Sequence, residues 1–435
     1  MFGQLAHAGP VTLLAAGQEQ QGQILREAVQ DYVGGSPESV SRSTIVSTTS
    51  EQSKPLLVHV AAVARSFYYA AQLGQMRYMK DNGFRVMVVA NPDEVLRRFA
   101  REAGINALGI SMKRAISPLR DLLAIWSIYW RLRKLKPQIV HAHTPKGGLV
   151  GMIGAFLAGV RIRVYHVHGL PHLTARGVSR RLLMSAEYVS CSLAHRVYFV
   201  SPSIRGIALE SGLCAQRKAR MLCHGSINGV DARLRFNPDN YNRAEILREM
   251  RIPAEAQVIG FIGRIVNDKG VRELMQAWEE LRDENRNLYL LIAGPMEDRD
   301  AIPADVKAKM LGDERVRYLG EVDDTAPLYK AMDVLAFPTY REGLPLVPLE
   351  ASAMEVPVVA TEIPGCVDAV VDSVTGVIVP AGNAPALKIA VESYLRDPIL
   401  RRKHGENGRK RALSDFCPDD IWEAQRAEYI DMMKS

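Results

Sequence analysis

The chain has 435 residues, of which 47% are hydrophobic and 24% charged, a balance typical of a folded globular protein. This length exceeds one ordinary hydrophobic core and predicts two domains. No apolar run reaches the roughly 18 residues of a membrane-spanning helix, the N-terminus lacks a signal-peptide pattern, and the five cysteines form no Cys-x-x-Cys pair. We therefore expect a cytoplasmic protein with reduced thiols.

Charge is distributed unevenly behind the net value of +7. Residues 55–230 hold 25 Lys or Arg against 7 Asp or Glu, a net charge of +18, whereas residues 231–435 hold 27 against 36, a net charge of −9. A basic half joined to an acidic half predicts that the basic half meets an anionic surface or substrate.

The first 54 residues are rich in Gln, Ser and Thr, and we expect a flexible tail there. Gln20–Tyr32 is a candidate short helix, and Ser36–Ser53 has the composition of a disordered segment. We assign no chemistry to this tail.

From Leu56 onward, short apolar runs alternate with helical stretches. The first half predicts strands at Leu56–Ala61, Arg85–Ala90, Ala107–Ser111, Ile139–His143, Val164–His168 and Val197–Ser201. Helices are expected between them, near Ser66–Lys80, Pro92–Ala103, Pro118–Leu135, Gly148–Ala158, Gly177–Leu193 and Ile204–Ser211.

The helix expected at Pro118–Leu135 is amphipathic, with two tryptophans and a cluster of Arg and Lys at its end. Such a composition suits an interfacial helix on anionic lipid. A helix that flanks a parallel sheet also needs an apolar face, so core packing would equally explain Leu122, Ile125 and Leu132. Both readings stay open.

The segment His143–Gly148 runs from a strand into a glycine-rich helix start, with Lys146 as its only cation. It lacks the spacing of a Walker A loop, whose lysine follows the second glycine. An anionic acceptor contact and a plain strand–helix turn are both compatible with this pattern.

His168 ends the next expected strand, directly before a glycine, where its ring could reach across a cleft; a hydrogen-bonded histidine at a sheet edge is the alternative. His141 and His143, like His166 and His168, are two positions apart and point the same way on a strand. No Asp, Glu or Cys lies near them in sequence, and neither pair has the helical His-Glu-x-x-His form, so we expect no metal site.

The pattern restarts after a looser stretch at Asn228–Pro253. Strands are expected at Val258–Gly263, Leu288–Ala293, Val316–Leu319, Val334–Pro338, Val356–Ala360 and Gly376–Val379, and a last helix at Asp419–Met433. Two successive β/α arrays predict an α/β protein with two doubly wound parallel sheets, whose ligands bind beyond the carboxyl ends of the strands, in the cleft between domains. The expected boundaries are 55–230 for the first domain, 231–417 for the second and 418–435 for a C-terminal helix.

Arg264 and Lys269 follow the first strand of this second array. Two fixed cations at a strand end could neutralise a diphosphate whose charge grows as a bond breaks. Taken alone, they could equally be surface cations at a strand–helix turn.

Glu342 and Glu350 flank a glycine and an apolar run after the strand at Val334–Pro338. The helix start near Pro345 offers backbone N–H groups that suit a phosphate. The two carboxylates stand about two helical turns apart, too far for a close pair of the glycosidase kind. Their structural alternatives are an N-terminal cap for Glu342 and a solvated helix face for Glu350.

The order and spacing of these motifs resemble retaining glycosyltransferases of family 4, which have the GT-B fold of two Rossmann-like domains facing a cleft. The resemblance covers roughly residues 55–435 and includes Ser226–Asp231, a typical interdomain segment of that family. His143–Gly148 and His168–Pro171 are most similar to bacterial capsule, O-antigen and glycan-assembly members, which extend sugars on a polyprenyl diphosphate carrier.

The resemblance implies a metal-independent, retaining hexosyl- or N-acetylhexosaminyltransferase that uses a nucleotide sugar, a UDP-sugar in the first place, and needs no cofactor. Arg264 and Lys269 would stabilise the leaving diphosphate, His168 and Glu342 would touch the donor sugar, and Glu350 the ribose. The donor site implied in this way comprises Gly263, Arg264, Lys269, Glu342, Gly343, Leu344, Pro345 and Glu350. The acceptor would be a lipid-linked saccharide, reached from an anionic membrane surface at the inner face of the cytoplasmic membrane, without nucleic acid as a partner.

Some positions depart from the family pattern. Ala64–Phe67 replaces the Gly-Gly loop of many relatives, and Val367 and Asp368 stand where Arg and Glu are expected, which removes one cation and shortens one carboxylate. Leu346 and Pro348 replace common Arg and Leu residues. Two rival functions remain open: a GT-B nucleotide-sugar epimerase, which needs no acceptor, and a non-catalytic protein that binds anions or nucleic acid through its basic half.

Overall fold

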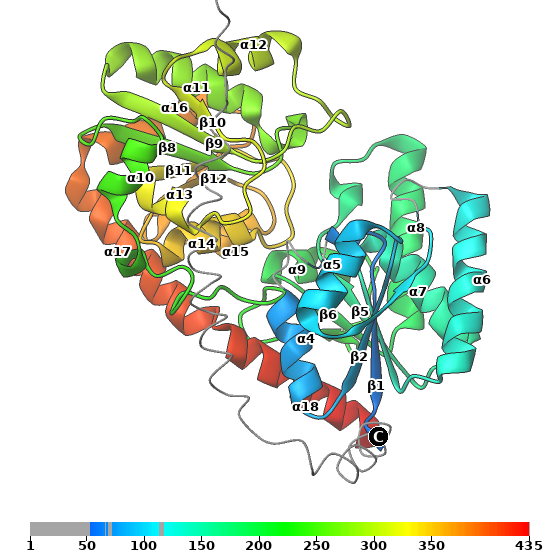
Figure 1. Ribbon diagram of the computed structural model, residues 1–435. Helices are drawn as coiled ribbons and strands as arrows, with labels where there is room; N and C mark the ends of the chain where they lie inside the picture. The colour runs from blue at the N-terminus through cyan, green and yellow to red at the C-terminus, as the bar shows by residue number, and fades with distance from the viewer. Residues whose placement is uncertain (1–52, 66, 68–71, 113–116, 435) are drawn as a thin grey trace, which may run out of the picture. The chain divides into compact units, whose positions relative to one another are not determined.

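The computed structural model describes residues 53–65, 67, 72–112 and 117–434. The candidate helix at Gln20–Tyr32 lies outside these residues, as does the expected disordered segment apart from Ser53. Two parallel sheets, with helices packed on them, lie within one compact unit, Pro55–Ser435 (Figure 1).

The first sheet has seven strands in the order β3-β2-β1-β4-β5-β6-β7, all parallel. The strand order reverses between β1 and β4, which is where a doubly wound sheet opens a crevice for ligands. Its strands are β1 (Leu56–Val60), β2 (Arg85–Ala90), β3 (Asn106–Gly109), β4 (Ile139–His143), β5 (Ile162–Val167), β6 (Arg196–Phe199) and β7 (Ala219–Arg220).

Helices and apolar side chains cover both faces of this sheet. Val58, Val140 and Ala142 belong to a core on one face, whereas Leu57 and Ile139 belong to a core on the other, because neighbouring residues of a strand point to opposite faces. The helices of this half are α4 (Gln72–Asp81), α5 (Glu94–Ala103), α6 (Pro118–Leu135), α7 (Pro145–Leu157), η1 (Pro171–Leu173), α8 (Gly177–Leu193) and α9 (Pro202–Glu210).

The second sheet has six parallel strands in the order β10-β9-β8-β11-β12-β13. Its strands are β8 (Gln257–Ile262), β9 (Leu288–Ala293), β10 (Val316–Tyr318), β11 (Val334–Phe337), β12 (Val358–Thr361) and β13 (Gly376–Val379). The helices that accompany it are η2 (Pro238–Asn240), α10 (Arg243–Glu249), η3 (Asn267–Lys269), α11 (Val271–Glu284), α12 (Ala304–Gly312), α13 (Ala326–Ala331), α14 (Leu346–Ala353), α15 (Cys366–Ala369), α16 (Ala384–Arg396) and α17 (Pro398–Asp415).

The α/β class with two Rossmann-like parallel sheets is confirmed, and each of the twelve expected strands is present with ends shifted by at most two residues. β7 was missed because two residues carry no readable alternation. β12 begins two residues later than expected, at Val358, because Pro357 has no N–H to donate to a ladder.

The helix expected to begin at Gly148 begins at Pro145, and its glycines lie inside the helix. A Cβ at Gly147 would come within 2.8 Å of the Ala61 Cα, and one at Gly148 within 2.2 Å of the Tyr165 ring. These glycines therefore let α7 pack closely on the sheet, and the helix starts three residues earlier than expected.

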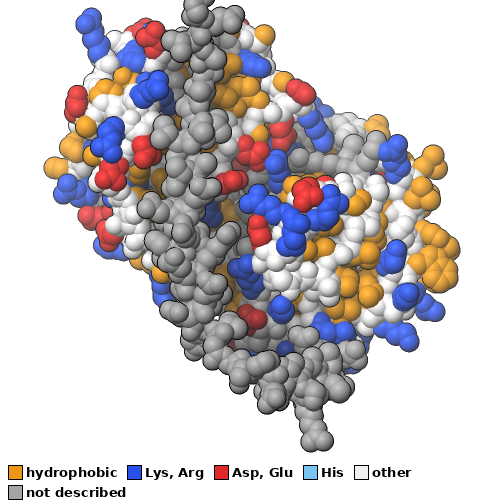
Figure 2. Space-filling model, in the orientation of Figure 1, with side chains coloured by type: hydrophobic (Ala, Val, Ile, Leu, Met, Phe, Trp, Pro, Cys, Tyr) orange, Lys and Arg blue, Asp and Glu red, His pale blue; other side chains and the backbone are white. Residues whose placement is uncertain are grey.

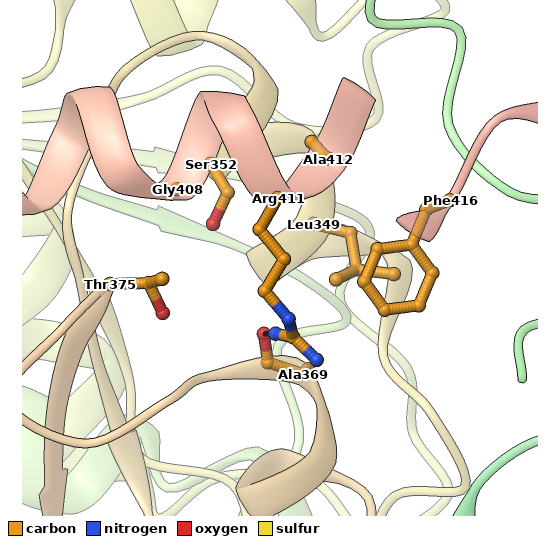
Figure 3. A pocket seen from close by; sticks show the side chains of 8 residues that line it. All are labelled: Leu349, Ser352, Ala369, Thr375, Gly408, Arg411, Ala412 and Phe416. Carbon is orange, nitrogen blue, oxygen red and sulfur yellow. Dashed lines mark hydrogen bonds between the residues drawn. The ribbon is translucent and has the colours of Figure 1, made fainter. Parts of the chain in front are cut away.

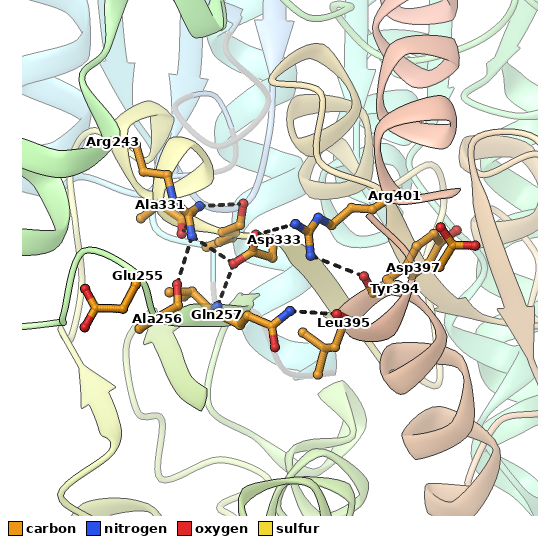
Figure 4. Close-up of polar contacts among 12 residues, drawn as sticks. Arg243, Glu255, Ala256, Gln257, Ala331, Asp333, Tyr394, Leu395, Asp397 and Arg401 are labelled. Atoms are coloured by element: carbon orange, nitrogen blue, oxygen red, sulfur yellow. Dashed lines mark hydrogen bonds and ion pairs between the residues drawn. The ribbon is translucent and has the colours of Figure 1, made fainter. Parts of the chain in front are cut away.

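A buried aspartate ties several elements of the second half together (Figure 4). Asp333, just before β11, accepts hydrogen bonds from Arg243 of α10 (2.8 Å) and from the backbone N–H of Val258 (2.8 Å), and it lies 3.4 Å from a guanidinium nitrogen of Arg401 on α17. Arg243 also donates to the carbonyl of Ala331 (2.6 Å). One carboxylate thus fixes the start of the central strands against two helices.

The last helix, α18 (Pro418–Lys434), packs on the first sheet rather than the second. Its Tyr429 is fully buried in the core formed by α4, α5 and the sheet, and its Gln425 accepts a 2.6 Å hydrogen bond from Gln75 of α4. Tyr429 and Gln425 are also both hydrogen-bonded to Nδ1 of His141 on β4. The C-terminal helix therefore supplies polar partners to the interior of the first domain.

We predict that Tyr429→Phe lowers the melting temperature by roughly 2–4 °C, because it removes a hydroxyl from a buried network while keeping the ring, a loss of about 1–2 kcal/mol. Thermal unfolding followed by fluorescence measures the effect. Tyr188→Phe is the control, since Tyr188 is 55% exposed. An unchanged melting temperature for Tyr429→Phe would show that the hydroxyl contributes no stability.

Candidate functional site

Lys269 and Arg264 lie where β8 gives way to α11. The chain passes through Gly263, a 3₁₀ turn that ends at Lys269, and Gly270, whose φ is 70°. A Cβ at Gly270 would lie 2.0 Å from the carbonyl oxygen of Pro338, so only glycine lets this turn lie against the end of β11. The two loops that carry Lys269 and Glu342 are thereby held together at one edge of the sheet.

Lys269 and Glu342 form a direct ion pair. Their side chains are only 14% and 15% exposed, and the hydroxyl of Thr339 donates a further hydrogen bond of 3.2 Å to the same Glu342 oxygen. The sequence predicted both residues in one site but not that they bind each other. A carboxylate here compensates the lysine charge, and a ligand anion would add to or replace that contact.

Arg264 is also paired with carboxylates. It donates to Glu297 at 2.9 Å and lies 3.8 Å from Asp268, which in turn binds Arg341 at 3.0 Å. Asp268, Glu297 and Arg341 were not expected from sequence, since they come from three separate loops with no shared motif. The site therefore has more cations than the two predicted, each balanced by an acid.

Glu350 contacts other residues than Glu342 does. It accepts a 2.8 Å hydrogen bond from the hydroxyl of Tyr329, and burial raises the pKa of its carboxyl. The reading of Glu350 as a solvated helix face is wrong, because the side chain points into the domain.

The loop Glu342–Pro345 passes directly against the first domain. A Cβ at Gly343 would lie 1.9 Å from the carbonyl oxygen of His168 and 3.1 Å from the backbone nitrogen of Gly169. Leu344 is buried in the second domain's core, and Pro345 precedes α14. The structure therefore brings His168 next to the Glu342 loop, as the cleft hypothesis expected.

Two serines at the start of α9 make contacts across the same junction and were missed. The hydroxyl of Ser201 donates to the carbonyl of Gly343 at 2.8 Å. The hydroxyl and backbone N–H of Ser203 both donate to Asp368, the N–H at 3.2 Å. From sequence, Ser201 was expected to end a strand, and Ser203 lay between that strand and the helix expected at Ile204–Ser211, so neither serine was assigned a contact.

Arg411 of α17 holds the backbone around Asp368. It donates to the carbonyl oxygens of Asp368 and Ala369, both at 2.6 Å, and Figure 3 shows its guanidinium beside Ala369. The shortened side chain at position 368 is thus directed to the N-terminus of α9. The family comparison had suggested only that Asp368 shortens a carboxylate, whereas in the structure this side chain binds Ser203.

Lys146, the candidate acceptor contact, forms an ion pair with Asp121 of α6, and both side chains are largely buried. This ion pair favours the interpretation of His143–Gly148 as a plain strand–helix turn over an acceptor contact. Its lysine is balanced by an acid in the same domain.

Five histidines meet beneath the carboxyl ends of β1, β4 and β5. They are His59, His141, His143, His166 and His168. Burial lowers the pKa of each imidazole, to about 3 for His59 and about 4 for His168, so all are neutral near pH 7. The sequence showed four of them, but only the β1–β4 pairing reveals that His59 joins them.

Two family models match the chain, one in each half. Residues 69–224 match a "Glycosyl transferase 4-like domain" and residues 242–411 match "Glycosyl transferases group 1". In the described part of the chain, no helix is sufficiently long and apolar to cross a membrane.

Known proteins match over most of the chain. A capsular polysaccharide biosynthesis glycosyltransferase, CapM of Staphylococcus aureus, is 32% identical over 87% of this chain and 97% of its own. A Campylobacter jejuni N,N'-diacetylbacillosaminyl-diphospho-undecaprenol alpha-1,3-N-acetylgalactosaminyltransferase is 24% identical over 79% of this chain and 91% of its own. The crystal structure of Anabaena HepE in complex with UDP and glucose shares the fold, with a TM-score of 0.72 at 18% identity over 87% of this chain and 99% of that one.

With the matching fold, the family models over both halves and a 32% identical relative along nearly its whole length, the chain belongs to the group 1 glycosyltransferases and is a glycosyltransferase of the GT-B fold.

Proposed function

We propose that the enzyme transfers a hexosyl or N-acetylhexosaminyl group from a UDP-sugar to a saccharide on a polyprenyl diphosphate, with retention of configuration and without a metal. The observation that carries this proposal is the pair Lys269–Glu342 beside Arg264, at the strand ends where the second domain meets His168. This geometry and the family resemblance support the proposed roles of the site residues.

The chemistry needs charge compensation more than a nucleophile. The bond between the anomeric carbon and the β-phosphate oxygen breaks, and a bond to the acceptor oxygen forms on the same face of the sugar. The proton of the acceptor hydroxyl passes to an oxygen of the departing diphosphate. Lys269 and Arg264 stabilise the negative charge that develops there, taking the place a metal ion holds in other transferases.

The two carboxylates would bind hydroxyl groups of the donor. Glu342 would accept hydrogen bonds from hydroxyls of the donor sugar, and Glu350 would accept hydrogen bonds from the ribose hydroxyls. Gly263, Gly343, Leu344 and Pro345 would line the donor with backbone groups, since glycine permits the close approach seen at position 343.

The choice of donor and acceptor class draws on relatives. The name of the Campylobacter relative specifies a diphospho-undecaprenol substrate, and HepE was crystallised with UDP and glucose. An acceptor-dependence assay separates this proposal from an epimerase, which would convert a UDP-sugar alone. The family identity already favours a transferase over a non-catalytic anion binder.

We predict that Lys269→Ala lowers turnover by a factor of roughly 10² or more, because this cation acts on charge that develops in the transition state. Lys309→Ala is a matched control, since Lys309 forms a 2.7 Å ion pair with Glu279 on the domain surface. Initial rates of UDP release with saturating acceptor measure the effect. Full activity of Lys269→Ala, with an unchanged melting temperature, would contradict the assignment.

Catalysis should also persist in excess EDTA, because two fixed cations already face the diphosphate. The measurement compares rates before and after chelation, then after addition of Mg²⁺ or Mn²⁺. Loss of turnover on chelation and its recovery with metal would show that the proposed charge compensation is wrong.

The first domain carries the membrane-facing surface in this proposal. α6 buries Ala124, Ile128 and Leu132 but leaves Trp126 59% and Trp130 53% exposed. Core packing therefore explains Leu132 and the partly buried Ile125, but not Leu122, which is also exposed. Exposed apolar residues continue on the neighbouring helices, and the whole set comprises Leu119, Leu122, Leu123, Trp126, Trp130, Phe156, Leu157, Val178 and Leu182.

Charge on the same helices suits an anionic lipid surface. Figure 2 shows hydrophobic side chains gathered over α6 at the right of the view, with Lys and Arg among them. Helices α6, α7 and α8 carry only two carboxylates: Asp121, paired with Lys146, and buried Glu187. Apolar side chains would insert among lipid tails while the cations meet phosphate headgroups at the inner face of the cytoplasmic membrane.

Co-sedimentation with vesicles tests this surface. Binding should require phosphatidylglycerol, fall with added salt, and drop at least about tenfold when Trp126→Ser and Trp130→Ser are combined, since both tryptophans would be buried in the interface. The pair Ile389→Ser and Ile399→Ser removes equally exposed apolar residues from the second domain and should change nothing. Equal pelleting with phosphatidylcholine vesicles, or no effect of the tryptophan changes, would refute the docking surface.

A further inference from the structure

Three of the five clustered histidines form a continuous hydrogen-bonded chain that ends at His168, beside the Glu342 loop. His59 Nδ1 lies 2.9 Å from His143 Nε2, and His143 Nδ1 lies 3.1 Å from His168 Nε2. His59 and His143 are fully buried, whereas His168 is partly exposed where it meets the Glu342 loop. A residue on β1 is thereby connected to the candidate donor site through two rings.

Because each imidazole is neutral, it carries one hydrogen, and the chain allows only two arrangements. Either every ring carries its hydrogen on Nδ1 and donates toward His168, or every ring carries it on Nε2 and donates toward His59. The arrangements differ at His59 Nε2, which is buried and has no hydrogen-bond partner among the described residues. The second arrangement would leave an unpaired N–H group at His59 Nε2, whereas the first leaves an unpaired acceptor nitrogen. A buried N–H group without an acceptor is the rarer and costlier of the two.

We propose that His59 and His143 are positioning residues that hold His168 in its Nδ1–H tautomer, so that His168 presents an N–H donor to the bound nucleotide sugar. The role of His168 toward the donor rests on the proposed function; its tautomer does not. Hydrogen on Nδ1 throughout leaves His168 Nε2 as an acceptor for His143 and directs the free N–H of the last ring away from the chain.

A metal ion is the competing occupant of this cluster. Two sets of three histidines in the described residues could supply ligands: His59, His141 and His143, or His143, His166 and His168. Two nitrogens on one tetrahedral zinc lie about 3.3 Å apart, given bonds of about 2.0–2.1 Å, whereas the chain has separations of 2.9 and 3.1 Å. Neither set includes a carboxylate to balance a buried dication. Geometry and charge thus favour a shared hydrogen over a metal.

Nitrogen-15 NMR of the full-length enzyme, labelled at histidine, tests the proposal directly. His168 is assigned by the resonance lost in His168→Gln. We expect a protonated Nδ1 and an unprotonated Nε2 in the native enzyme, and a shift toward the other tautomer in His59→Phe, which keeps a ring but has no donor. His59→Asn restores an N–H near the position of Nδ1 and should restore the native pattern.

Kinetics add a second readout. His59→Phe should lower kcat about tenfold, the loss of one well-placed hydrogen bond, with the KM for the UDP-sugar within about twofold, and His59→Asn should recover most of the rate. His404→Phe is the control, because it removes another buried histidine, hydrogen-bonded to Tyr394 at 2.7 Å, and should leave His168 unchanged.

The outcomes separate this inference from the proposed function. If native His168 carries its hydrogen on Nε2, or if its tautomer does not change in His59→Phe, the positioning role of His59 and His143 is overturned, even in an active transferase. Tight binding of one equivalent of Zn²⁺ that displaces the hydrogen shared by His59 Nδ1 and His143 Nε2 would overturn the positioning role as well. An Nδ1–H tautomer controlled by His59 supports it, whichever donor the enzyme uses.

Discussion

A largely buried lysine–glutamate ion pair, Lys269–Glu342, is the interaction on which the site depends. Two charges taken from water are stable only when each compensates the other, so neither side chain can be removed without leaving an uncompensated charge. The glycine at 270 keeps the two loops close enough for this contact. In the proposed function, the lysine of this pair would meet the diphosphate and its carboxylate the sugar hydroxyls.

The junction between the domains is built around the same loop. Gly343 lies against the His168 carbonyl, its own carbonyl accepts from Ser201, and Asp368 caps the helix that Ser201 begins. Small side chains and backbone groups make most of these contacts, so the loop that carries Glu342 lies directly against His168. α18 joins the first domain's core through Tyr429 and Gln425, which are both hydrogen-bonded to His141 of the histidine cluster.

Much of the fold was predictable because buried parallel strands read as short apolar runs, and twelve of them stood out. The spacing of Arg264, Lys269, Glu342 and Glu350 led to the prediction of a donor site in the second domain, and the structure brings two of these residues, Lys269 and Glu342, into contact. What sequence could not show were pairings across distance: Lys269 and Glu342 are 73 positions apart, and His59 reaches His143 only because β1 and β4 are neighbours. The exposed face of α6 was also undecidable, since an amphipathic pattern does not say which apolar residues find the core.

We propose a division of labour in which Lys269 binds the diphosphate and Glu342 binds the sugar. Calorimetric titration of UDP, which lacks the sugar, into Glu342→Gln and Lys269→Ala tests it most directly. We predict that UDP binds Glu342→Gln at least as tightly as the native enzyme, because this change removes a negative charge beside the diphosphate. Lys269→Ala should bind UDP at least about tenfold more weakly. Equal loss of UDP affinity in both variants would contradict it.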